Sequence, residues 1–273
     1  MQIGFNGRFF KENWRPALQE IEFGYRHGFR ALQFQGTEQG VSTRHLGTEI
    51  SYVGDALEGA GIVAVMEIVV RINASGRTAS GQTPLDVLQA NLPAIIGFPC
   101  HYVHWHLAAE KPRDPSAISG MEKELLTQFI GAVGLAQRHS FKFGFEHNEP
   151  NLLLLSDPYA CAKLLNAVPQ LGFVWDLNHT IQGHLDAFQA LTPRMSMLHV
   201  SDTLLPEVNY HLPIGQGNID FATYCQVLNK NQFDGPAILE IGGQPKYGGF
   251  GRDTDKELIE SARRLKEACL GRD

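Results

Sequence analysis

The sequence predicts a single (β/α)8 TIM barrel over residues 1–273, with its functional site at the carboxyl ends of the strands. Three observations predict this fold. Short apolar runs alternate eight times with stretches of helical period. The connections between them are short, which favours a parallel sheet with right-handed crossovers. Eight such units in 273 residues agree with the usual size of this barrel, and no clear linker divides the chain.

The expected strands have apolar interiors, because the strands of a barrel are buried on both faces. The first strand leads into Asn6-Gly7-Arg8 and not into the GxGxxG turn that opens many doubly wound sheets, which favours the closed barrel. The eight expected strands are Gln2–Asn6, Ala31–Gln35, Val63–Val69, Tyr102–Leu107, Lys142–Glu146, Gly172–Asp176, Met195–Val200 and Ala237–Ile241.

The stretches between the strands place apolar residues near a 3.6-residue period. Thr83 and Asp157 each precede a proline, which is typical of an N-cap followed by the first helical turn. Asp220 and Thr254 are expected to cap the last two helices. The other expected helices are Trp14–His27, Leu85–Ile96, Ser119–Gln137 and Pro158–Val168. Four longer connections follow strands and should rim the site: Arg71–Gln82, Glu110–Ser119, Asp202–Gly217 and Gly242–Asp253.

The composition argues against several classes of partner. A net charge of −6 disfavours a broad nucleic-acid or anionic-membrane surface, because phosphate binding needs a basic face. No apolar run approaches the roughly 18 residues of a spanning helix. The opening MQIGFNGRFF lacks the design of a signal peptide, so we expect a cytoplasmic protein. Four widely spaced cysteines are interpreted as reduced, mostly buried thiols: Cys100, Cys161, Cys225 and Cys269.

Four potential metal ligands stand at the ends of the last four strands: Glu146, Asp176, His199 and Glu240. Because parallel strands end at the same edge of a barrel, these side chains should converge. Three carboxylates in one place repel one another unless a cation neutralises them. Any one of them alone could equally pair with a basic residue or face solvent. Four at matched positions favour a site for one divalent cation, with Mn, Zn, Mg or Co as candidates.

Histidines supply the candidate substrate contacts. His179 follows Asp176 by three residues, and His211 precedes a glycine-containing loop. His104 and His106 flank Trp105, so that at least one of them should line the barrel mouth. The alternative for each is a histidine bonded to backbone or satisfied within the core.

Two further glutamates could contribute to the site, and the sequence lacks the motifs of several other chemistries. Glu67 is interpreted either as a support for the ligands or as half of an ordinary ion pair, and Glu149 is expected to point into a loop. The chain has no GxSxG, P-loop or HExxH motif, which disfavours serine-nucleophile, nucleotide and zincin chemistry.

The motifs after residue 140 resemble those of the xylose-isomerase-like barrel superfamily. This superfamily includes tagatose/psicose 3-epimerases, hydroxypyruvate isomerase, inosose dehydratase and the endonuclease IV DNA-repair enzymes. The resemblance covers essentially the whole chain. Its motifs are Glu146, the Asp176-Leu177-Asn178-His179 run, the His199-Val200-Ser201-Asp202 run, Glu240, and the stretch HLPIGQGNIDF from His211 to Phe221.

The resemblance implies a divalent-metal-dependent isomerase or epimerase of a sugar or keto acid, working through an enediolate. By the resemblance, Glu146, Asp176, His199 and Glu240 hold the metal, and the two glutamates are also catalytic because they move the proton. His179 would hold a substrate oxygen, and His106 and His211 are further substrate-binding candidates. Partners would be a small-molecule substrate and a second copy of the chain in a homo-oligomer, with no nucleic acid and no membrane.

Three departures leave the branch open. The 3-epimerases have an arginine where this chain has Pro206 and a second glutamate where it has Leu152. The DNA-repair branch has an aspartate where this chain has Asn209. A dehydratase or lyase of the same superfamily is therefore the first alternative. An endonuclease IV-like nuclease and a non-catalytic metal- or sugar-binding protein are the others.

Overall fold

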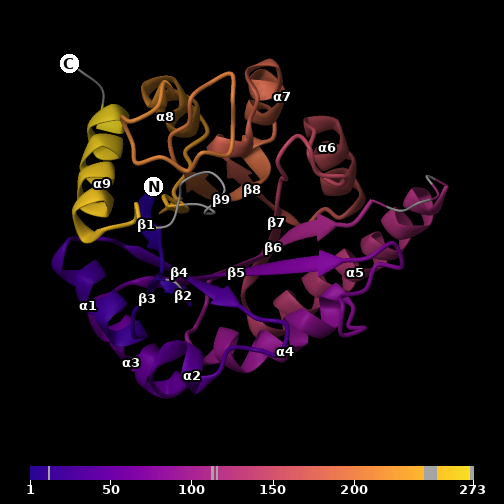
Figure 1. Ribbon diagram of the computed structural model, residues 1–273, viewed down its shortest axis with the longest axis horizontal. Helices are drawn as coiled ribbons and strands as arrows, with labels where there is room; N and C mark the ends of the chain where they lie inside the picture. The colour runs from indigo at the N-terminus through magenta and orange to yellow at the C-terminus, as the bar shows by residue number, and fades with distance from the viewer. Residues whose placement is uncertain (12, 112–113, 115, 243–250, 271–273) are drawn as a thin grey trace.

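A closed barrel of eight parallel strands forms the centre of the molecule (Figure 1). The computed structural model describes residues 1–11, 13–111, 114, 116–242 and 251–270. Around the barrel the order is β1-β10-β9-β8-β7-β6-β5-β4, which confirms the expected fold. The strands are β1 Gln2–Asn6, β4 Ala31–Gly36, β5 Val63–Ile72, β6 Tyr102–Ala109, β7 Lys142–Glu146, β8 Gly172–Asp176, β9 Met195–Val200 and β10 Pro236–Leu239.

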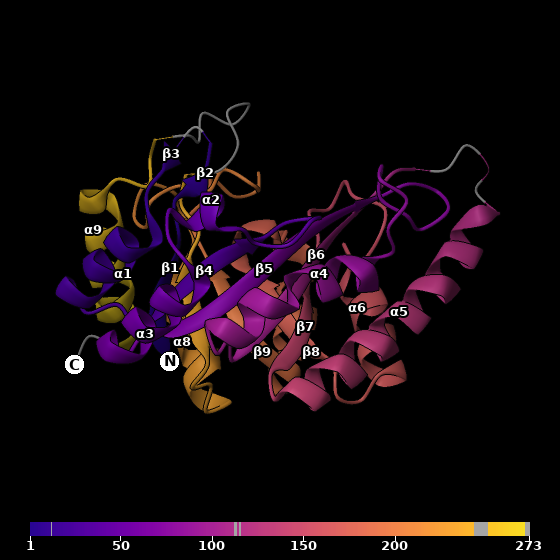
Figure 2. The same cartoon turned by 90° about the horizontal axis from the view of Figure 1, so that it is seen from below.

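The helices lie outside the ring of strands, as the two perpendicular views show (Figures 1 and 2). All four expected caps form. The side chains of Thr83, Asp157, Asp220 and Thr254 each accept a hydrogen bond from a backbone amide of the first turn. The helices are α1 Ala17–Arg26, α2 Thr43–Leu46, α3 Ile50–Ala60, α4 Pro84–Gly97, α5 Ala117–His139, α6 Pro158–Ala167, α7 Leu185–Gln189, α8 Phe221–Lys230 and α9 Asp255–Leu270.

The first helix is shorter than the sequence predicts. It begins at Ala17 and not at Trp14, because β3 Asn13–Trp14 pairs antiparallel with β2 Phe9–Phe10. Pro16 disfavours a helical conformation in the residue before it, which fixes the boundary. Helix α3 was not expected, although its buried Val53 and Leu57 have helical spacing, because its two glycines lower helix propensity.

Inside the barrel, an apolar layer supports the site. Ala31, Val65, Val174, Met197 and Ile238 form one buried cluster. Each lies two residues before a polar residue on its own strand or, for Ile238, directly after the end of the strand, and side chains two apart on a strand share a face. The polar side chains therefore also point into the barrel, one step nearer the carboxyl ends of the strands. They are Gln33, Glu67, Asp176, His199 and Glu240.

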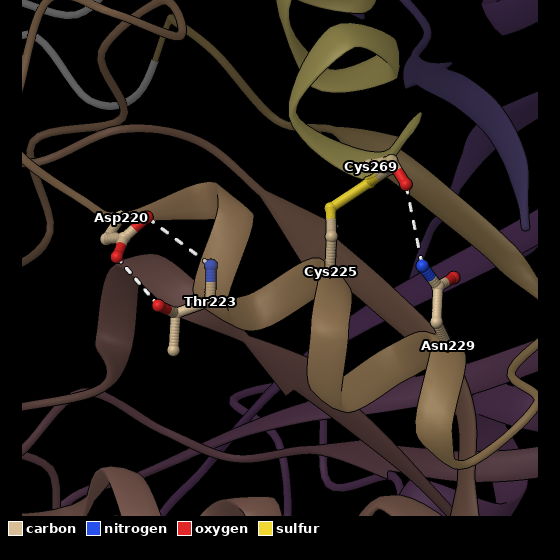
Figure 3. Close-up of a disulfide and its surroundings, with 5 residues drawn as sticks. All are labelled: Asp220, Thr223, Cys225, Asn229 and Cys269. Atoms are coloured by element: carbon tan, nitrogen blue, oxygen red, sulfur yellow. Dashed lines mark hydrogen bonds between the residues drawn. A yellow bond between two sulfur atoms is a disulfide. The ribbon is translucent and has the colours of Figure 1, made fainter. Parts of the chain in front are cut away.

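Two cysteines correct the expectation of four reduced thiols. Cys225 on α8 and Cys269 on α9 form a disulfide with a Cα–Cα distance of 4.9 Å (Figure 3). Cys100 and Cys161 are free and buried, as expected. The separation of 44 residues gave no signal in the sequence, because it is the packing of α8 against α9 that brings the two sulfurs together.

A fully paired charge cluster ties the two ends of the chain together. Arg8, after β1, donates two hydrogen bonds of 2.9 Å to the buried carboxylate of Glu20 on α1. Arg8 also pairs with Asp255 at the start of α9, and Arg15 lies 3.0 Å from the same carboxylate. We call these four residues the Arg8 network. No helix in the described part of the chain combines the length and apolar character needed to cross a membrane.

Candidate metal centre and active site

The structure brings Glu146, Asp176, His199 and Glu240 together at one end of the barrel. Glu146, Asp176 and His199 lie at or next to the ends of β7, β8 and β9, and Glu240 follows the last residue of β10. One ligand atom from each lies within 4.8 Å of the corresponding atoms of the other three. His199 Nδ1 is 3.2 Å from Glu146 Oε1 and 3.2 Å from Glu240 Oε2.

Four of the atoms that face this point lack hydrogen-bond partners in the described part of the chain. Among the described residues, both carboxylate oxygens of Glu146, Oδ2 of Asp176 and Nδ1 of His199 are buried without one. Buried polar atoms are nearly always satisfied, so a group of them aimed at one point needs an explanation. Three carboxylates and one imidazole are the donor set of a divalent cation such as Mn²⁺ or Zn²⁺. The residues therefore fit the metal that the sequence predicts.

The ionisable groups of the cluster shift one another's pKa values. Burial favours a neutral Glu146, but His106 and His199 outweigh it and hold the pKa of Glu146 well below its usual value. In the same way, His199 offsets the burial of Glu240 and lowers its pKa to about 2. Burial also lowers the pKa of His199, yet Glu146 and Glu240 raise it well above its usual range. Asp176 differs, because burial dominates and raises its pKa.

His199 and Glu67 are joined through Gln33, a residue that the sequence analysis missed. Gln33 Oε1 is 3.0 Å from His199 Nε2, and Gln33 Nε2 donates to Glu67 Oε2 at 3.2 Å. Glu67 Oε1 is in turn 3.5 Å from His106 Nδ1. Among the described residues Glu67 has no lysine or arginine partner, and its contacts are the ion pair with His106 and the hydrogen bond from Gln33.

His106 and His179 flank the carboxylate of Glu146. His106 Nδ1 is 3.4 Å from Glu146 Oε2, and His179 Nδ1 is 3.5 Å from Glu146 Oε1. His179 Nε2 also lies 3.2 Å from Asp176 Oδ2. Glu149 does not simply point into a loop, because its carboxylate lies within 4.0 Å of both histidines. Its place followed from no pattern in the sequence, since the loop after β7 folds back over the site.

His211 lies at the same mouth but is held by other atoms. Its Nδ1 is 2.9 Å from the carbonyl oxygen of Glu240, and its Nε2 is 2.8 Å from Asn209 Oδ1. Asn209 also donates to Glu149 Oε1 at 3.0 Å. Both His211 and Asn209 have positive φ angles, which non-glycine residues adopt rarely. This tight turn holds the ring of His211 5.8 Å from that of His179.

His104 and His147 are buried behind the ligands. His104 Nε2 lies 3.7 Å from Glu146 Oε2, and His147 Nε2 is 2.9 Å from the carbonyl oxygen of Asp176. Burial lowers the pKa of each imidazole to about 3, so both are neutral at physiological pH. These two neutral imidazoles pack behind the ligands and add no charge to the cluster.

A cavity of about 640 Å³ opens beside the cluster. Its walls include Glu240, His106, His179 and His211, whereas Glu146 is buried behind them. The volume is of the size that small-molecule sites have. A smaller cavity of about 370 Å³ near the start of β7 to β9 has no acidic residue or histidine among its described lining residues. The larger cavity is thus the one that can place a substrate beside the ligands.

The cavity wall also includes Arg71, near the end of β5. Arg71 follows Glu67 by four residues on the same face of the strand. Of the loops expected to rim the site, residues of 71–82 and 202–217 line the cavity, and residues 243–250 of the last loop lie outside the described residues.

Comparison with known proteins agrees with the fold of this chain. Residues 21–268 match the family described as a xylose isomerase-like TIM barrel. No curated protein matches the sequence. Among solved structures, the chain is similar to a D-tagatose 3-epimerase-like protein, with 15% identity, 99% of this chain and 97% of that chain covered, and a TM-score of 0.76.

Two other solved structures have the same fold. One is the IolI protein with a binding zinc atom, with 15% identity, 97% and 96% of the two chains covered, and a TM-score of 0.74. The other is an AP endonuclease, family 2, from Brucella melitensis, with 16% identity, 96% and 98% covered, and a TM-score of 0.70. At such identities these likenesses show the fold alone.

Proposed function

The chain belongs to the xylose isomerase-like TIM barrel family, and we propose that it is a divalent-metal-dependent isomerase or epimerase of a small sugar or keto acid. The observation that carries this proposal is the convergence of buried, unpartnered ligand atoms at the wall of a substrate-sized cavity. The epimerase-like neighbour supports the same class of substrate.

Glu146, Asp176, His199 and Glu240 would hold one metal ion. A divalent cation in this position supplies Lewis acidity, which stabilises the negative charge that develops on an enediolate. Asn6 donates to Glu240 Oε1 at 3.1 Å, which leaves Oε2 facing His199 and the centre of the cluster. Asn178 fixes Asp176 in a similar way by donating its backbone N–H to Oδ1.

Glu240 and Glu146 are the proposed acid–base pair. Glu240 reaches the cavity, so it is placed to take a proton from a carbon next to a carbonyl group. In the metal-free protein its pKa of about 2 keeps the carboxylate of Glu240 ionised at neutral pH. Glu146, once it has taken up a proton from solvent, would deliver that proton to the opposite face or to the neighbouring carbon, while Glu240 keeps the proton that it removed. His106 and His179 lie on either side of Glu146 and would orient it.

The histidines of the cavity wall suit a polyhydroxylated substrate. His106, His179 and His211 all line the cavity. The ring nitrogens of His106 and His179 can hydrogen-bond hydroxyl or carbonyl oxygens, and His211 would do so by exchanging its contact with Asn209 for one with the substrate. We therefore assign them to substrate binding.

A dehydratase or lyase is the second candidate, because it would share the proton abstraction and differ only in expelling a β-hydroxyl. The nuclease alternative is disfavoured by the net charge of −6 and by Asn209, which stands where that branch has an aspartate. A protein that only binds metal or sugar would keep the ligands but catalyse no exchange of protons.

Solvent exchange tests the proposal. Metal-loaded protein is incubated in D₂O with a panel of ketoses and keto acids, and deuterium incorporation is followed by NMR. We expect metal-dependent incorporation at a carbon next to the carbonyl, with an isomer or epimer as product. Loss of water from the substrate would identify a lyase. No exchange with any substrate, together with cleavage of abasic duplex DNA, would instead identify a nuclease.

A further inference from the structure

The side chain of Gln33 contacts both a candidate metal ligand and a second carboxylate. It is fully buried on β4, across the barrel from β9, and its amide bridges a candidate metal ligand and a second carboxylate. Its carbonyl oxygen faces His199 Nε2 at 3.0 Å, and its NH₂ group faces Glu67 Oε2 at 3.2 Å.

The hydrogen bonds of this amide define its orientation. The NH₂ group of Gln33 donates to Oε2 of Glu67, which accepts. The carbonyl oxygen of Gln33 then faces His199, and an oxygen can only accept. His199 Nε2 must therefore carry a proton. The remaining nitrogen, Nδ1, is the one that faces Glu146 and Glu240 at 3.2 Å.

The reversed amide would have the opposite effect. Its NH₂ group would demand a lone pair on His199 Nε2, which would place the proton of a neutral imidazole on Nδ1. That proton would point at the carboxylates and occupy the place of a cation. The reversed oxygen would also lie against the carboxylate of Glu67, which would then need a proton of its own.

We propose that Gln33 is a positioning residue that keeps the proton of His199 on Nε2, so that His199 binds the metal through Nδ1. The proposal rests on the proposed metal centre and extends it by naming the ligand atom and the residue that selects it. Partners that hydrogen-bond the second nitrogen of a ligating histidine typically fix its tautomer and orientation. Such partners are usually carboxylates or backbone carbonyls, whereas here it is a side-chain amide backed by Glu67.

Zinc affinity of chelator-treated protein tests the proposal. Gln33→Leu removes the acceptor with little change in size, and we expect zinc to bind about 10- to 100-fold more weakly. Gln35→Leu is the matched control. Gln35 lies two residues further along the same strand and has no hydrogen bond to a ligand, so its substitution should leave zinc affinity unchanged.

A reversed pair separates the hydrogen bond from packing. In Gln33→Glu with Glu67→Gln, the new carboxylate accepts from both His199 and the new amide, so the pattern of donors and acceptors is restored. We expect this double variant to bind zinc close to the wild-type affinity. Thermal unfolding of each variant, measured without metal, checks that the fold is intact.

NMR of the zinc-loaded protein gives a direct readout. Long-range ¹H–¹⁵N correlation of histidine-labelled protein should show His199 protonated at Nε2. A proton on Nδ1, or wild-type zinc affinity in Gln33→Leu, would overturn the role of Gln33. If the wild-type protein binds no zinc or other divalent cation, the proposed metal centre itself fails, and the inference fails with it.

Discussion

Two charge clusters of this barrel, each centred on buried residues, are built in opposite ways. In the Arg8 network, the carboxylate of Glu20 receives two hydrogen bonds from a guanidinium group, and each acidic group faces an arginine. At the mouth of the barrel, carboxylates meet one another and a histidine, and several of their atoms have no hydrogen-bond partner in the described part of the chain.

The difference separates a structural role from a functional one. A paired cluster needs nothing further, and its effect is to hold α1 and α9 against the end of β1. A cluster whose buried atoms lack hydrogen-bond partners keeps a cost of burial that a ligand can relieve. The functional site is therefore identified by buried polar atoms without hydrogen-bond partners, and not by charge or burial alone.

The largest expected effect follows from breaking the unpaired cluster at Glu146. Glu146→Gln removes a proposed acid–base group with almost no change in shape. We expect deuterium exchange into the substrate to fall by about 10²- to 10⁴-fold. Glu58→Gln, on the exposed face of α3, is the matched control and should exchange at the wild-type rate. Full activity of the Glu146 variant would contradict the mechanism.

Stability should respond in opposite directions at the two clusters. Glu20→Gln weakens the pairing of a buried arginine, and we expect the free energy of unfolding to fall by about 3–5 kcal/mol. Burial raises the pKa of both Glu20 and Asp176. Their contacts differ, because Glu20 accepts two hydrogen bonds from Arg8, whereas Oδ2 of Asp176 is buried without a hydrogen-bond partner among the described residues, so the charge of Asp176 opposes folding of the metal-free protein. Asp176→Asn should therefore leave metal-free stability unchanged or raise it. Chemical denaturation without metal measures both variants, and equal losses would remove the distinction.

The disulfide offers a third region for comparison, because it lies away from both clusters. Cys269→Ser opens a link between residues 44 apart and should lower the free energy of unfolding by about 2–4 kcal/mol. Substrate exchange by the folded variant should not change, since no ligand lies on α8 or α9. An effect of this substitution on zinc affinity would show that the helix pair supports the site.

The pH dependence of metal binding is the mildest test. Burial lowers the pKa of His199, but Glu146 and Glu240 raise it further, so the metal-free imidazole is protonated at neutral pH. A metal must displace the Nδ1 proton, so affinity should rise with pH, by about tenfold per unit for one proton released. The stability of the metal-free protein should depend on pH in the opposite direction, because it falls as pH rises. The stability that the imidazolium contributes is complete below pH 6.5 and is lost as pH rises through the raised pKa. Calorimetric titrations across the neutral range measure the first trend.

Most of the barrel was predictable because its strands are apolar runs whose bounds are set by burial. Lys142–Glu146, Gly172–Asp176 and Met195–Val200 agree with the structure at both ends. Glu146 and Asp176 were identifiable because ionisable residues interrupt these runs at their carboxyl ends. Gln33 was not identified by this reasoning, because it is uncharged and lies within Ala31–Gly36 and not at its end.

Other parts of the site were not predictable, because they depend on how distant segments pack. Glu149 belongs to a loop whose path is set by contacts with His106 and Asn209. Asn6 reaches Glu240 only because β1 closes the barrel against β10. The Cys225–Cys269 bond likewise depends on helix packing that no local pattern records.

Metal stoichiometry tests the central claim most directly. Chelator-treated wild-type protein is titrated with Zn²⁺ or Mn²⁺ by calorimetry, and bound metal is counted by elemental analysis. We expect one ion per chain in the wild type, none in His199→Ala, and one in Glu20→Gln, whose substitution lies in the paired cluster. Absence of bound metal in the wild type, or full binding by His199→Ala, would contradict the account.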